Sequence, residues 1–504
     1  MVDPRHVEQI PFGAQSVCDL FDHQVRLRPA GTAVRTPRCS LTYAELDQLT
    51  ARLARRLQRR GIGPGTIVGL HARRSLDALT GLVAVLRCGA AFLPLDVKDP
   101  SRRKQEVLAD AGCSLTLVDA PAAWCADSEP ISDPDRADDD AGGELPRPTP
   151  LELAYAITTS GSTGRPKVVG IPHAGIFNLV MASIEELDLI RPGDTILWTP
   201  MLTADISIHD CLMALCWGAT VAIPDSSDLS IGRMAATAQT LGATIVDLPA
   251  AVLGPYSRLL VPPLAEAGVR LVLTGGSQLD GDGFADRESL VVANGYGPSE
   301  ATVAVTWYRC TATTPTWVPI GRPFRGVRLY VLDEKMNQVP AGEQGQLHIS
   351  GICLARGYLR LPGRTAAAFL PDPFASAPGE RMYATGDLVR QGQEGEFVYL
   401  GRIDNQVKIS GYRVELGEVE HAVRDCPGVF DASALLREDA PGGAAIAVFI
   451  VGDQIPDKAI EDRLRDRLPS HMMPRYYVWL DDIPLNHLGK VDRRALAAIP
   501  LAAP

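Results

Sequence analysis

Residues Leu151–Lys167 read LELAYAITTSGSTGRPK and join an apolar run to a loop of small polar residues. The apolar run predicts a buried β-strand. The loop Thr158–Lys167 carries five hydroxyl side chains, two glycines and a lysine. Because glycines let backbone N–H groups approach phosphate oxygens, hydroxyls add donors and lysine adds charge, the stretch predicts a phosphate-binding loop at a strand end. It lacks the Walker A pattern, and taken alone it is also typical of a flexible Ser/Gly turn.

Helical and strand patterns alternate on both sides of this loop. Residues 42–60 carry leucines at helical spacing, and Leu76–Leu86 predicts a second helix between apolar runs at Ile67–Leu70 and 90–96. Further short apolar runs occur at Leu115–Val118, Thr220–Ile223, Thr244–Leu248 and Arg270–Leu273. This alternation predicts an α/β fold.

The pattern changes after Pro319. Strands joined by Gly-rich turns are predicted at Val327–Leu332, Gly345–Ile349 and Glu396–Leu400, and the remainder reads as a compact α+β unit. The boundary is placed near Gly401–Asp404. The sequence thus predicts an N-terminal domain at 1–402, with helix-flanked sheets and a β-rich subdomain, and a C-terminal domain at 403–504. The acidic, Pro- and Gly-rich stretch 126–150 is predicted to be a solvated loop.

Composition narrows the class of protein. The chain has 504 residues, 46% of them hydrophobic, and a net charge of -11, which argues against nucleic acid and anionic membranes as partners. Its ten cysteines form no Cys-x-x-Cys pair, so no metal cluster is predicted and a reducing compartment is expected. The start has no apolar signal region and no run of about 18 apolar residues occurs, so we expect a cytoplasmic protein.

Three further motifs carry polar chemistry. In NGYGPSE, Asn294–Glu300, a tyrosine beside Gly-Pro can present its ring to a base and the glutamate can hold Mg²⁺. In YATGDL, Tyr383–Leu388, Asp387 can accept hydrogen bonds from ribose hydroxyls. HLGKVDRRAL near the C-terminus places Lys490 in a tight turn. Each motif alone is also typical of an ordinary surface turn.

Together and in this order, these segments resemble the adenylate-forming superfamily, and most closely the adenylation domains of non-ribosomal peptide synthetases. Additional matching motifs are LTYAEL (Leu41–Leu46), RCGAAFLPLD (Arg87–Asp96), PIGRP (Pro319–Pro323), GQLHISGICLARGYL (Gly345–Leu359), GRIDNQVKISGYRVELGEVE (Gly401–Glu420) and LPSHMMP (Leu468–Pro474). The resemblance covers about residues 15–497. It implies a large N-terminal domain, a small mobile C-terminal lid, ATP and Mg²⁺ as cofactors, and formation of an acyl-adenylate with release of pyrophosphate.

The resemblance also implies roles for single residues. Lys490 would be the catalytic lysine between the substrate carboxylate and the α-phosphate, Glu300 would bind Mg²⁺, and Asp404 would be the hinge of the lid. Tyr296 would stack on adenine, while Asp387 and Arg402 would hold the ribose and its surroundings. The remaining nucleotide-binding positions are Thr159, Ser160, Gly161, Ser162, Thr163, Gly164, Lys167, Gly297 and Ser299.

Asp205, in TADISIHD, matches the aspartate that pairs with the substrate amino group in this family. A helix cap is the simpler interpretation of such an aspartate. By the same resemblance the other substrate-binding positions are Ile206, His209, Asp247, Leu273, Gly275, Gly295, Val303 and Ala304. Asp247 lies in the apolar stretch ATIVDLPAAVL, and a carboxylate there needs a partner. A substrate with a polar or basic side chain would supply one. His209 as an internal partner, or a β-amino acid substrate, are alternatives, and Gly275 and Gly295 are expected to leave room.

The acceptor predicted from the resemblance is the phosphopantetheine thiol of a carrier protein. No Gly-x-[Asp/His]-Ser carrier pattern follows residue 497, so we expect a separate carrier, or a domain taken from a longer chain. An MbtH-like partner is a further option. Ala204 replaces the family's usual aromatic residue, and Leu488 replaces an asparagine before Gly489–Lys490. An acyl- or aryl-CoA ligase and a catalytically silent binding homologue are the alternative functions.

Overall fold

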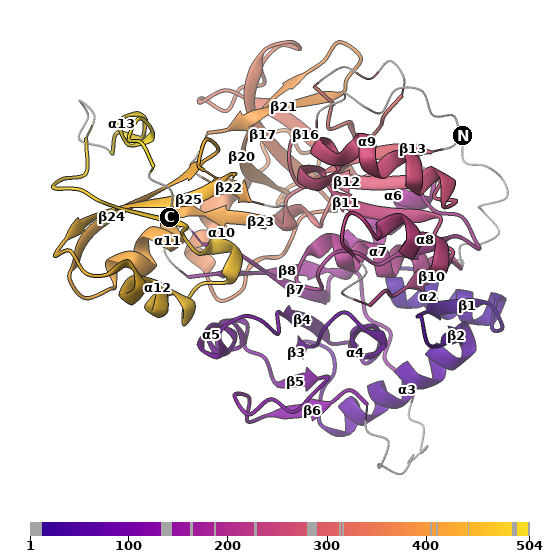
Figure 1. Cartoon of the computed structure of the whole chain (residues 1–504). Coiled ribbons are helices and arrows are strands. Elements are labelled where there is room, and N and C mark those ends of the chain that lie inside the picture. The colour runs from indigo at the N-terminus through magenta and orange to yellow at the C-terminus, as the bar shows by residue number, and fades with distance from the viewer. Residues whose placement is uncertain are drawn as a thin grey trace. The chain divides into compact units, whose positions relative to one another are not determined.

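The computed structural model describes residues 13–132, 144–161, 165–185, 188–225, 229–279, 290–311, 314, 317–403, 406–409, 412–441, 443–485 and 491–501. The chain divides into two compact units. The first comprises Met1–Val97, Ala111–Ile157 and Val168–Ile403, and the second comprises Lys98–Asp110, Thr158–Lys167 and Asp404–Pro504. Helices and strands alternate along much of the first unit (Figure 1), so the predicted α/β class is confirmed.

A seven-stranded sheet contains the strands on either side of the Ser/Gly loop. Its inner strands β3, β4 and β5 are parallel, and β18 pairs antiparallel with β8. In spatial order the strands are β18 (Gly357–Tyr358), β8 (Lys167–Pro172), β7 (Leu153–Thr159), β4 (Ala91–Leu95), β3 (Ile67–His71), β5 (Leu115–Val118) and β6 (Ser128–Pro130). Strand β6 lies inside the stretch predicted to be a loop, so that prediction is wrong for these residues.

A second sheet has nine strands, and its centre is parallel. In spatial order they are β15 (Arg322–Pro323), β14 (Thr306–Arg309), β13 (Val291–Tyr296), β12 (Leu271–Gly275), β11 (Ile245–Pro249), β9 (Thr195–Leu197), β10 (Thr220–Ala222), β1 (Thr32–Arg35) and β2 (Ser40–Thr42). The helices of this unit include α2 (Val17–Leu27), α3 (Tyr43–Arg59), α4 (Leu76–Arg87), α6 (His173–Glu185), α7 (Asp205–Cys216), α8 (Met234–Leu241) and α9 (Ala250–Glu266).

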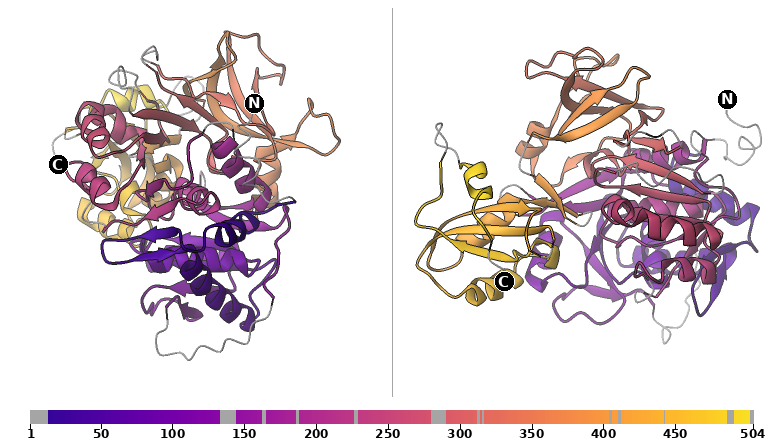
Figure 2. Two further views of the ribbon diagram at one scale, coloured as in Figure 1. Left: turned by 90° about the vertical axis from the view of Figure 1, so that its right-hand side faces the viewer. Right: turned by 45° about the horizontal axis from the view of Figure 1, so that its top comes forward.

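The centre of the nine-stranded sheet is buried on both faces. Ile245, Leu273 and Ala293 share a hydrophobic core with Ile208 and Leu212 of α7. Their neighbours Val246, Val272 and Val292 instead join the core formed with α8 and α9, which lie along that face in Figure 2. Because side chains alternate between faces of a strand, Asp247, two residues after Ile245, lies on the face toward α7.

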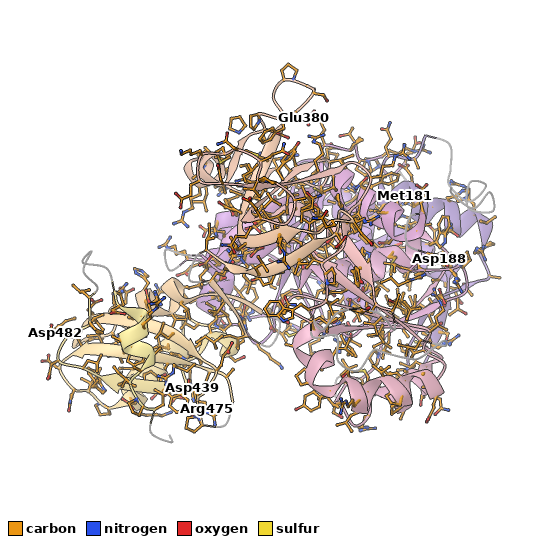
Figure 3. The ribbon with its side chains drawn as sticks, turned by 90° about the horizontal axis from the view of Figure 1, so that it is seen from above. Met181, Asp188, Glu380, Asp439, Arg475 and Asp482 are labelled. Carbon is orange, nitrogen blue, oxygen red and sulfur yellow. The ribbon has the colours of Figure 1, made fainter. Side chains whose placement is uncertain are left out.

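A five-stranded sheet completes the first unit, with β17 (Gln344–Gly351) and β20 (Arg381–Gln391) at its centre. The other elements are β16 (Val327–Leu332), α10 (Pro362–Ala368), β19 (Phe369–Pro371) and β21 (Phe397–Arg402). Glu380, labelled in Figure 3, lies just before β20 and pairs with Arg328 of β16.

The second unit has a hairpin and a three-stranded sheet. Its elements are α5 (Ser101–Ala111), β22 (Gln406–Ile409), β23 (Tyr412–Glu415), α11 (Leu416–Arg424), β24 (Val429–Arg437), β25 (Ala445–Gly452), α12 (Asp457–Arg465), β26 (Tyr476–Trp479) and α13 (Arg493–Ala497). Val419 and Val423 of α11 pack with Val448 and Ile450 of β25 in one core.

Local sequence explains where the helices begin. Thr42 caps α3 reciprocally with Glu45, and Ser16 caps α2 in the same way with Asp19, so orphan backbone donors are satisfied at both starts. Helix α3 therefore begins one residue inside the predicted range 42–60. Within the part of the chain that the structure describes, no helix is long and apolar enough to span a membrane.

Candidate active site

Three of the predicted nucleotide-binding residues meet at Asp387. Strands β20 and β21 pair with Asp387 opposite Arg402, whose Nη1 donates to Asp387 Oδ1 at 2.5 Å. Arg402 Nη2 also donates to the Thr385 carbonyl at 3.1 Å. The Tyr296 hydroxyl, from the end of β13, donates to Asp387 Oδ2. Both carboxylate oxygens of Asp387 therefore accept a hydrogen bond, and the bond from its hydroxyl holds the Tyr296 side chain in place.

Burial and the neighbouring Asp387 charge raise the pKa of Tyr296 well above its usual value. The phenol therefore keeps its proton and remains a donor to Asp387. Tyr296 is 8% exposed and Asp387 is 5% exposed. Tyr296, Asp387 and Arg402 thus form a preorganised polar cluster in which each Asp387 oxygen has one donor.

The turn after β13 joins the predicted amino-group site to the predicted metal ligand. Ser299, in the short 3₁₀ helix Ser299–Ala301, donates its hydroxyl to Asp205 Oδ2, and the Ile206 N–H donates to Asp205 Oδ1 at 2.9 Å. The adjacent Glu300 is fully buried and accepts from the Tyr358 hydroxyl at 2.9 Å. Asp205 is the first residue of α7, and Ala204 is the N-cap, so Asp205 is not a helix cap.

The electrostatics at Asp205 favour a cationic ligand. Burial raises the pKa of Asp205, and the Glu300 charge adds to this, although the bonds from Ser299 and Ile206 act in the opposite sense. An amino group carrying a positive charge would stabilise the ionised carboxylate. The geometry thus fits the predicted pairing with a substrate amine.

Backbone conformation at this turn is unusual. Thr302 and Val303 have φ values of 59° and 66°, in the left-handed region that β-branched residues rarely occupy. A β-carbon at Gly297 would lie 2.6 Å from the Ala304 Cα atom and 2.6 Å from the Val303 carbonyl oxygen. Only glycine at position 297 allows the backbone of Val303 and Ala304 to approach so closely. These two predicted positions therefore lie against the NGYGPSE turn.

The predicted side-chain positions lie on neighbouring strands of the nine-stranded sheet. Asp247 is opposite Leu273, and Gly275 is opposite Gly295. A β-carbon at Gly275 would lie 2.6 Å from the Gly295 carbonyl oxygen, so the neighbouring strand fills that space and the expectation that Gly275 leaves room is wrong. A β-carbon at Gly295 would lie 2.7 Å from the Trp307 ring. The expectation that Gly295 leaves open room is therefore wrong, because the Trp307 indole occupies that space.

His209 is fully buried and is not the partner of Asp247. Its Nε2 atom is 2.9 Å from the Ser183 hydroxyl, while its Nδ1 atom has no hydrogen-bond partner among the described residues and lies 3.6 Å from Asp210 Oδ1. Burial lowers the pKa of His209 to about 4, so the ring is neutral at physiological pH. Within the same residues no hydrogen bond joins His209 to Asp247, and the internal-pair interpretation is not supported.

The Ser/Gly loop leaves β7 and lies in the second unit with Glu418. The Gly161 N–H donates to Glu418 Oε2 at 3.1 Å, and Arg103 donates to the other Glu418 oxygen at 2.6 Å. The Ser160 hydroxyl donates to the Arg413 carbonyl at 3.0 Å. An anionic oxygen on the Gly161 amide is the kind of acceptor that the predicted phosphate contact requires.

Other features of the loop also suit a phosphate. Thr159 is 7% exposed, and its hydroxyl has no partner in the part of the chain that is described. A β-carbon at Gly161 would lie 1.7 Å from the Arg165 carbonyl oxygen, so the turn requires glycine. Lys167 is buried at the start of β8.

Several predicted residues lie outside the described residues: Ser162, Thr163, Gly164, Asp404 and Lys490. Their roles stay predictions. The described part of the chain holds no group of three or more His, Cys, Asp or Glu side chains suited to a metal. The donor chemistry nevertheless fits the implied Mg²⁺, because this ion is commonly bound by one carboxylate, here Glu300, together with substrate phosphates and water.

The sequence interpretation missed three residues of this region. Tyr358 binds Glu300, Trp307 fills the space beside Gly295, and Asp210 follows His209 on α7. Asp210 Oδ1 lies 3.6 Å from His209 Nδ1, and its position directly after a predicted site residue was the only signal in the sequence. Trp307 and Tyr358 are brought in by strand pairings that local patterns do not specify.

Comparison with known proteins identifies the family. The family model described as AMP-binding enzyme matches residues 21–359, and the model of the AMP-binding enzyme C-terminal domain matches residues 418–490. The chain belongs to the AMP-binding enzyme family. The predicted arrangement of a large N-terminal and a smaller C-terminal domain is confirmed at this level.

The relatives of this chain include components of non-ribosomal peptide synthetases. It is 39% identical over 498 residues to a component of the linear gramicidin synthase of Brevibacillus parabrevis, covering 94% of this chain and 9% of that protein. It is 37% identical to phosphinothricin tripeptide synthetase PhsC of Streptomyces viridochromogenes, covering 98% of this chain and 45% of that one. The chain thus spans less than half the length of these relatives. Novobiocin biosynthesis protein H of Streptomyces niveus is 35% identical, with 97% of this chain and 83% of that protein covered.

A solved structure supports the same assignment. PA1221, described as an NRPS protein containing adenylation and PCP domains, superimposes with a TM-score of 0.83 at 27% identity, covering 96% of both chains. Its holo form bound to a vinylsulfonamide inhibitor gives a TM-score of 0.85 at 28% identity, covering 97% of this chain and 85% of that one. The resemblance to adenylate-forming enzymes of the non-ribosomal peptide synthetase type is confirmed.

Proposed function

We propose that this chain activates an amino acid as its adenylate and then loads it onto a carrier protein. In the first step a carboxylate oxygen of the amino acid attacks the α-phosphorus of ATP, and pyrophosphate leaves. In the second, a phosphopantetheine thiol attacks the acyl carbonyl, the thiol loses its proton, and AMP leaves with the bond electrons. The observation that carries the proposal is the turn in which Ser299 binds Asp205 and the next residue is Glu300.

This turn ties the amine-binding carboxylate to nucleotide chemistry. Asp205 would hold the substrate amino group, and Tyr296 would hold the adenine while Asp387 and Arg402 hold the ribose. The substrate carboxylate and the α-phosphate are both anionic, so the rate depends on positioning and on positive charge at the reacting phosphorus. Lys490 would supply that charge from the chain, and Mg²⁺ on Glu300 would supply more when bound.

Residues of the Ser/Gly loop would bind the β- and γ-phosphates. Among the described residues Thr159 offers an unpartnered hydroxyl, and the Gly161 N–H already bonds an anionic oxygen. Leu273, Ile206, Val303 and Ala304 would line the side-chain region, with Asp247 as its charged member. We further propose a polar or basic amino acid as substrate, a separate carrier protein as acceptor, an MbtH-like protein as an optional partner, and a cytoplasmic location. The adenylation–PCP architecture of PA1221 supports a carrier as acceptor.

ATP–pyrophosphate exchange tests the proposal. We expect Mg²⁺-dependent exchange with an α-amino acid, and we expect Lys490→Ala to reduce it by about 10²-fold or more, since charge at the reacting centre is lost. The matched control is Lys458→Ala, which removes an exposed lysine of α12. Equal exchange in the Lys490 variant and the control would refute the assigned role.

The acceptor is tested separately. Transfer of a radiolabelled acyl group to a phosphopantetheinylated carrier protein is expected, with free CoA as the competing acceptor. Preferential acylation of CoA would instead identify a CoA ligase. Absence of exchange with α-amino, β-amino and aryl acids, with and without an MbtH-like protein, would identify a silent homologue.

A further inference from the structure

The predicted metal ligand Glu300 is bound by the segment that leads from β17 into β18, residues 352–358. The Ala355 N–H donates to the Glu300 carbonyl at 2.9 Å. The Tyr358 hydroxyl donates to Glu300 Oε1, also at 2.9 Å. The main chain and the side chain of Glu300 are therefore both bound by the same segment.

This segment is itself anchored on both sides of Ala355. The Thr302 hydroxyl, from the turn that carries Glu300, donates to the Cys353 carbonyl at 2.6 Å. Arg381, the first residue of β20, donates from Nη2 to the Ala355 carbonyl at 3.0 Å and from Nη1 to the Arg356 carbonyl at 3.1 Å. Three main-chain carbonyls of the segment are thus bound by side chains from other elements of the first unit, which hold its backbone in place.

The Tyr358 ring is also fixed. Tyr358 lies opposite Val169 of β8, and its N–H donates to the Thr365 hydroxyl at 3.0 Å. It is 7% exposed, and its ring meets the Phe369 ring edge-on, with the ring centroids 5.8 Å apart. A buried ring packed in this way presents its hydroxyl from a constant position.

Glu300 needs a fixed partner because it is fully buried, away from bulk water. A glutamate side chain has several rotatable bonds, and a donor at one carboxylate oxygen fixes the plane of the group and thereby the direction of the other oxygen. A hydrogen bond to an ionised carboxylate is stronger than one between neutral groups. In metal sites, partners of this kind orient the ligating carboxylate, and their loss weakens metal binding.

Resting on the proposed amino acid adenylation, we propose that Tyr358 is a positioning residue for Glu300. Its hydroxyl orients the carboxylate toward the divalent cation that accompanies ATP, so Tyr358 acts through Glu300 and not on the cation itself. The ligand class is a hard cation that prefers oxygen ligands, with Mg²⁺ for activity and Mn²⁺ as its spectroscopic substitute.

The test is Tyr358→Phe, which removes the hydroxyl and keeps the ring. We expect the Mg²⁺ concentration for half-maximal ATP–pyrophosphate exchange to rise by about 10-fold, the lower end of the range for loss of such a partner. Saturating Mg²⁺ should restore the rate, and the KM for the amino acid should stay unchanged. Mn²⁺ binding to the protein with α,β-methylene-ATP, measured from the electron paramagnetic resonance signal of free Mn²⁺, should weaken by the same factor without any turnover.

The matched control is Tyr330→Phe, which removes a tyrosine hydroxyl that donates to Asp372 Oδ2 at 3.3 Å in the five-stranded sheet. Its Mg²⁺ requirement and Mn²⁺ affinity should equal those of the wild type. If Tyr358→Phe does not fold, Arg381→Lys provides the second variant. Because it weakens the anchor of the segment, it should also raise the Mg²⁺ requirement.

The double variant of Tyr358→Phe with Glu300→Gln isolates the link between the two residues. Once the carboxylate is absent, removal of the hydroxyl should weaken Mn²⁺ binding no further. A further loss as large as that in the single variant would show that Tyr358 acts elsewhere and would overturn the inference.

The outcomes separate this inference from the proposed function. Mg²⁺-dependent exchange by the wild type, together with an unchanged Mg²⁺ requirement and Mn²⁺ affinity in Tyr358→Phe, would overturn the positioning role and leave adenylation intact. An unchanged requirement in Arg381→Lys, where that variant replaces the first, would do the same. Absence of exchange by the wild type with every acid would instead overturn the proposed function and, with it, this inference.

Discussion

The first unit contains buried carboxylates in two opposite states. Asp387 is 5% exposed and has both oxygens bound, by Arg402 and by Tyr296. Asp210 is fully buried, neither oxygen has a hydrogen-bond partner among the described residues, and Oδ1 lies 3.6 Å from Nδ1 of the neutral His209. The first arrangement is complete before any ligand binds, whereas the second is incomplete.

The proposed function assigns the two regions different ligands, the nucleoside at Asp387 and the substrate side chain near Asp247. In the proposed function the nucleoside is the same in every turnover, so a rigid, fully paired cluster at Asp387 would hold it with little reorganisation. In the proposed function, a polar or basic substrate side chain would bring the partner for Asp247. Such incomplete sites reduce the stability of the free protein in exchange for function.

The largest expected effect is at the paired carboxylate. Asp387→Ala leaves Arg402 buried without its counter-ion and removes the acceptor of Tyr296, so we expect unfolding free energy to fall by about 3 to 5 kcal/mol. Chemical denaturation measures this. The double variant with Arg402→Ala should recover part of the loss, because no unpaired charge remains. Additive losses in the double variant would contradict the pairing.

At Asp210 and Asp247, removal of the charge should raise the unfolding free energy at neutral pH instead of lowering it. The raised pKa values of Asp210 and Asp247 mean that the folded protein binds protons which the unfolded chain, with pKa values near 3.8, has released. Wild-type stability from this source is thus present below about pH 3.8 and is lost as pH rises above it. Asp247→Asn needs no proton, so its stability relative to wild type should increase with pH by at most about 1.4 kcal/mol per pH unit.

Denaturation of wild type and variant at several pH values checks this prediction. The difference between the two curves matters, since carboxylates with lowered pKa values, such as Asp425 and Asp439, change both curves in the opposite sense. A variant less stable than wild type at neutral pH would show that Asp247 is paired after all.

Two paired glycines, Gly275 of β12 and Gly295 of β13, should respond differently to alanine. Gly275→Ala meets the Gly295 backbone, which cannot move aside, and we expect a loss of about 1 to 3 kcal/mol. Gly295→Ala meets the Trp307 ring, a side chain that can shift, so the loss should be smaller, about 1 kcal/mol, with a raised KM for the amino acid. Thermal unfolding and exchange kinetics measure the two effects. Equal destabilisation by both would contradict the side-chain assignment at Gly295.

The smallest effect is expected at His209. Because its pKa is lowered to about 4, the ring stays neutral between pH 5 and 8 and contributes no titration there. His209→Gln should therefore leave the pH profile of exchange unchanged over this range, although KM changes by a few-fold. A profile that loses an ionisation near pH 6 in the variant would show that His209 titrates in the working enzyme.

The sequence predicted most local elements but not the contacts that complete the site. Strands at Leu115–Val118 and Val327–Leu332 match the observed bounds; the first is an apolar run buried throughout, and the second alternates apolar and polar residues and is half-buried. The hydrogen bond between Tyr296 and Asp387 joins residues from two separate motifs, and their roles at the nucleotide stay predictions. In contrast, Trp307 reaches Gly295 only through the pairing of β13 with β14. Register between strands depends on the whole fold, and no local pattern specifies it.

The most direct test of the proposed function is Mg²⁺-dependent ATP–pyrophosphate exchange by the wild-type chain with arginine, citrulline, lysine and Nε-acetyllysine. We predict exchange that requires Mg²⁺ and favours one cationic acid over its neutral counterpart by about 10-fold or more. Exchange that is equal for charged and neutral acids would contradict the role proposed for Asp247. Absence of exchange with these and all other carboxylic acids would contradict adenylation itself.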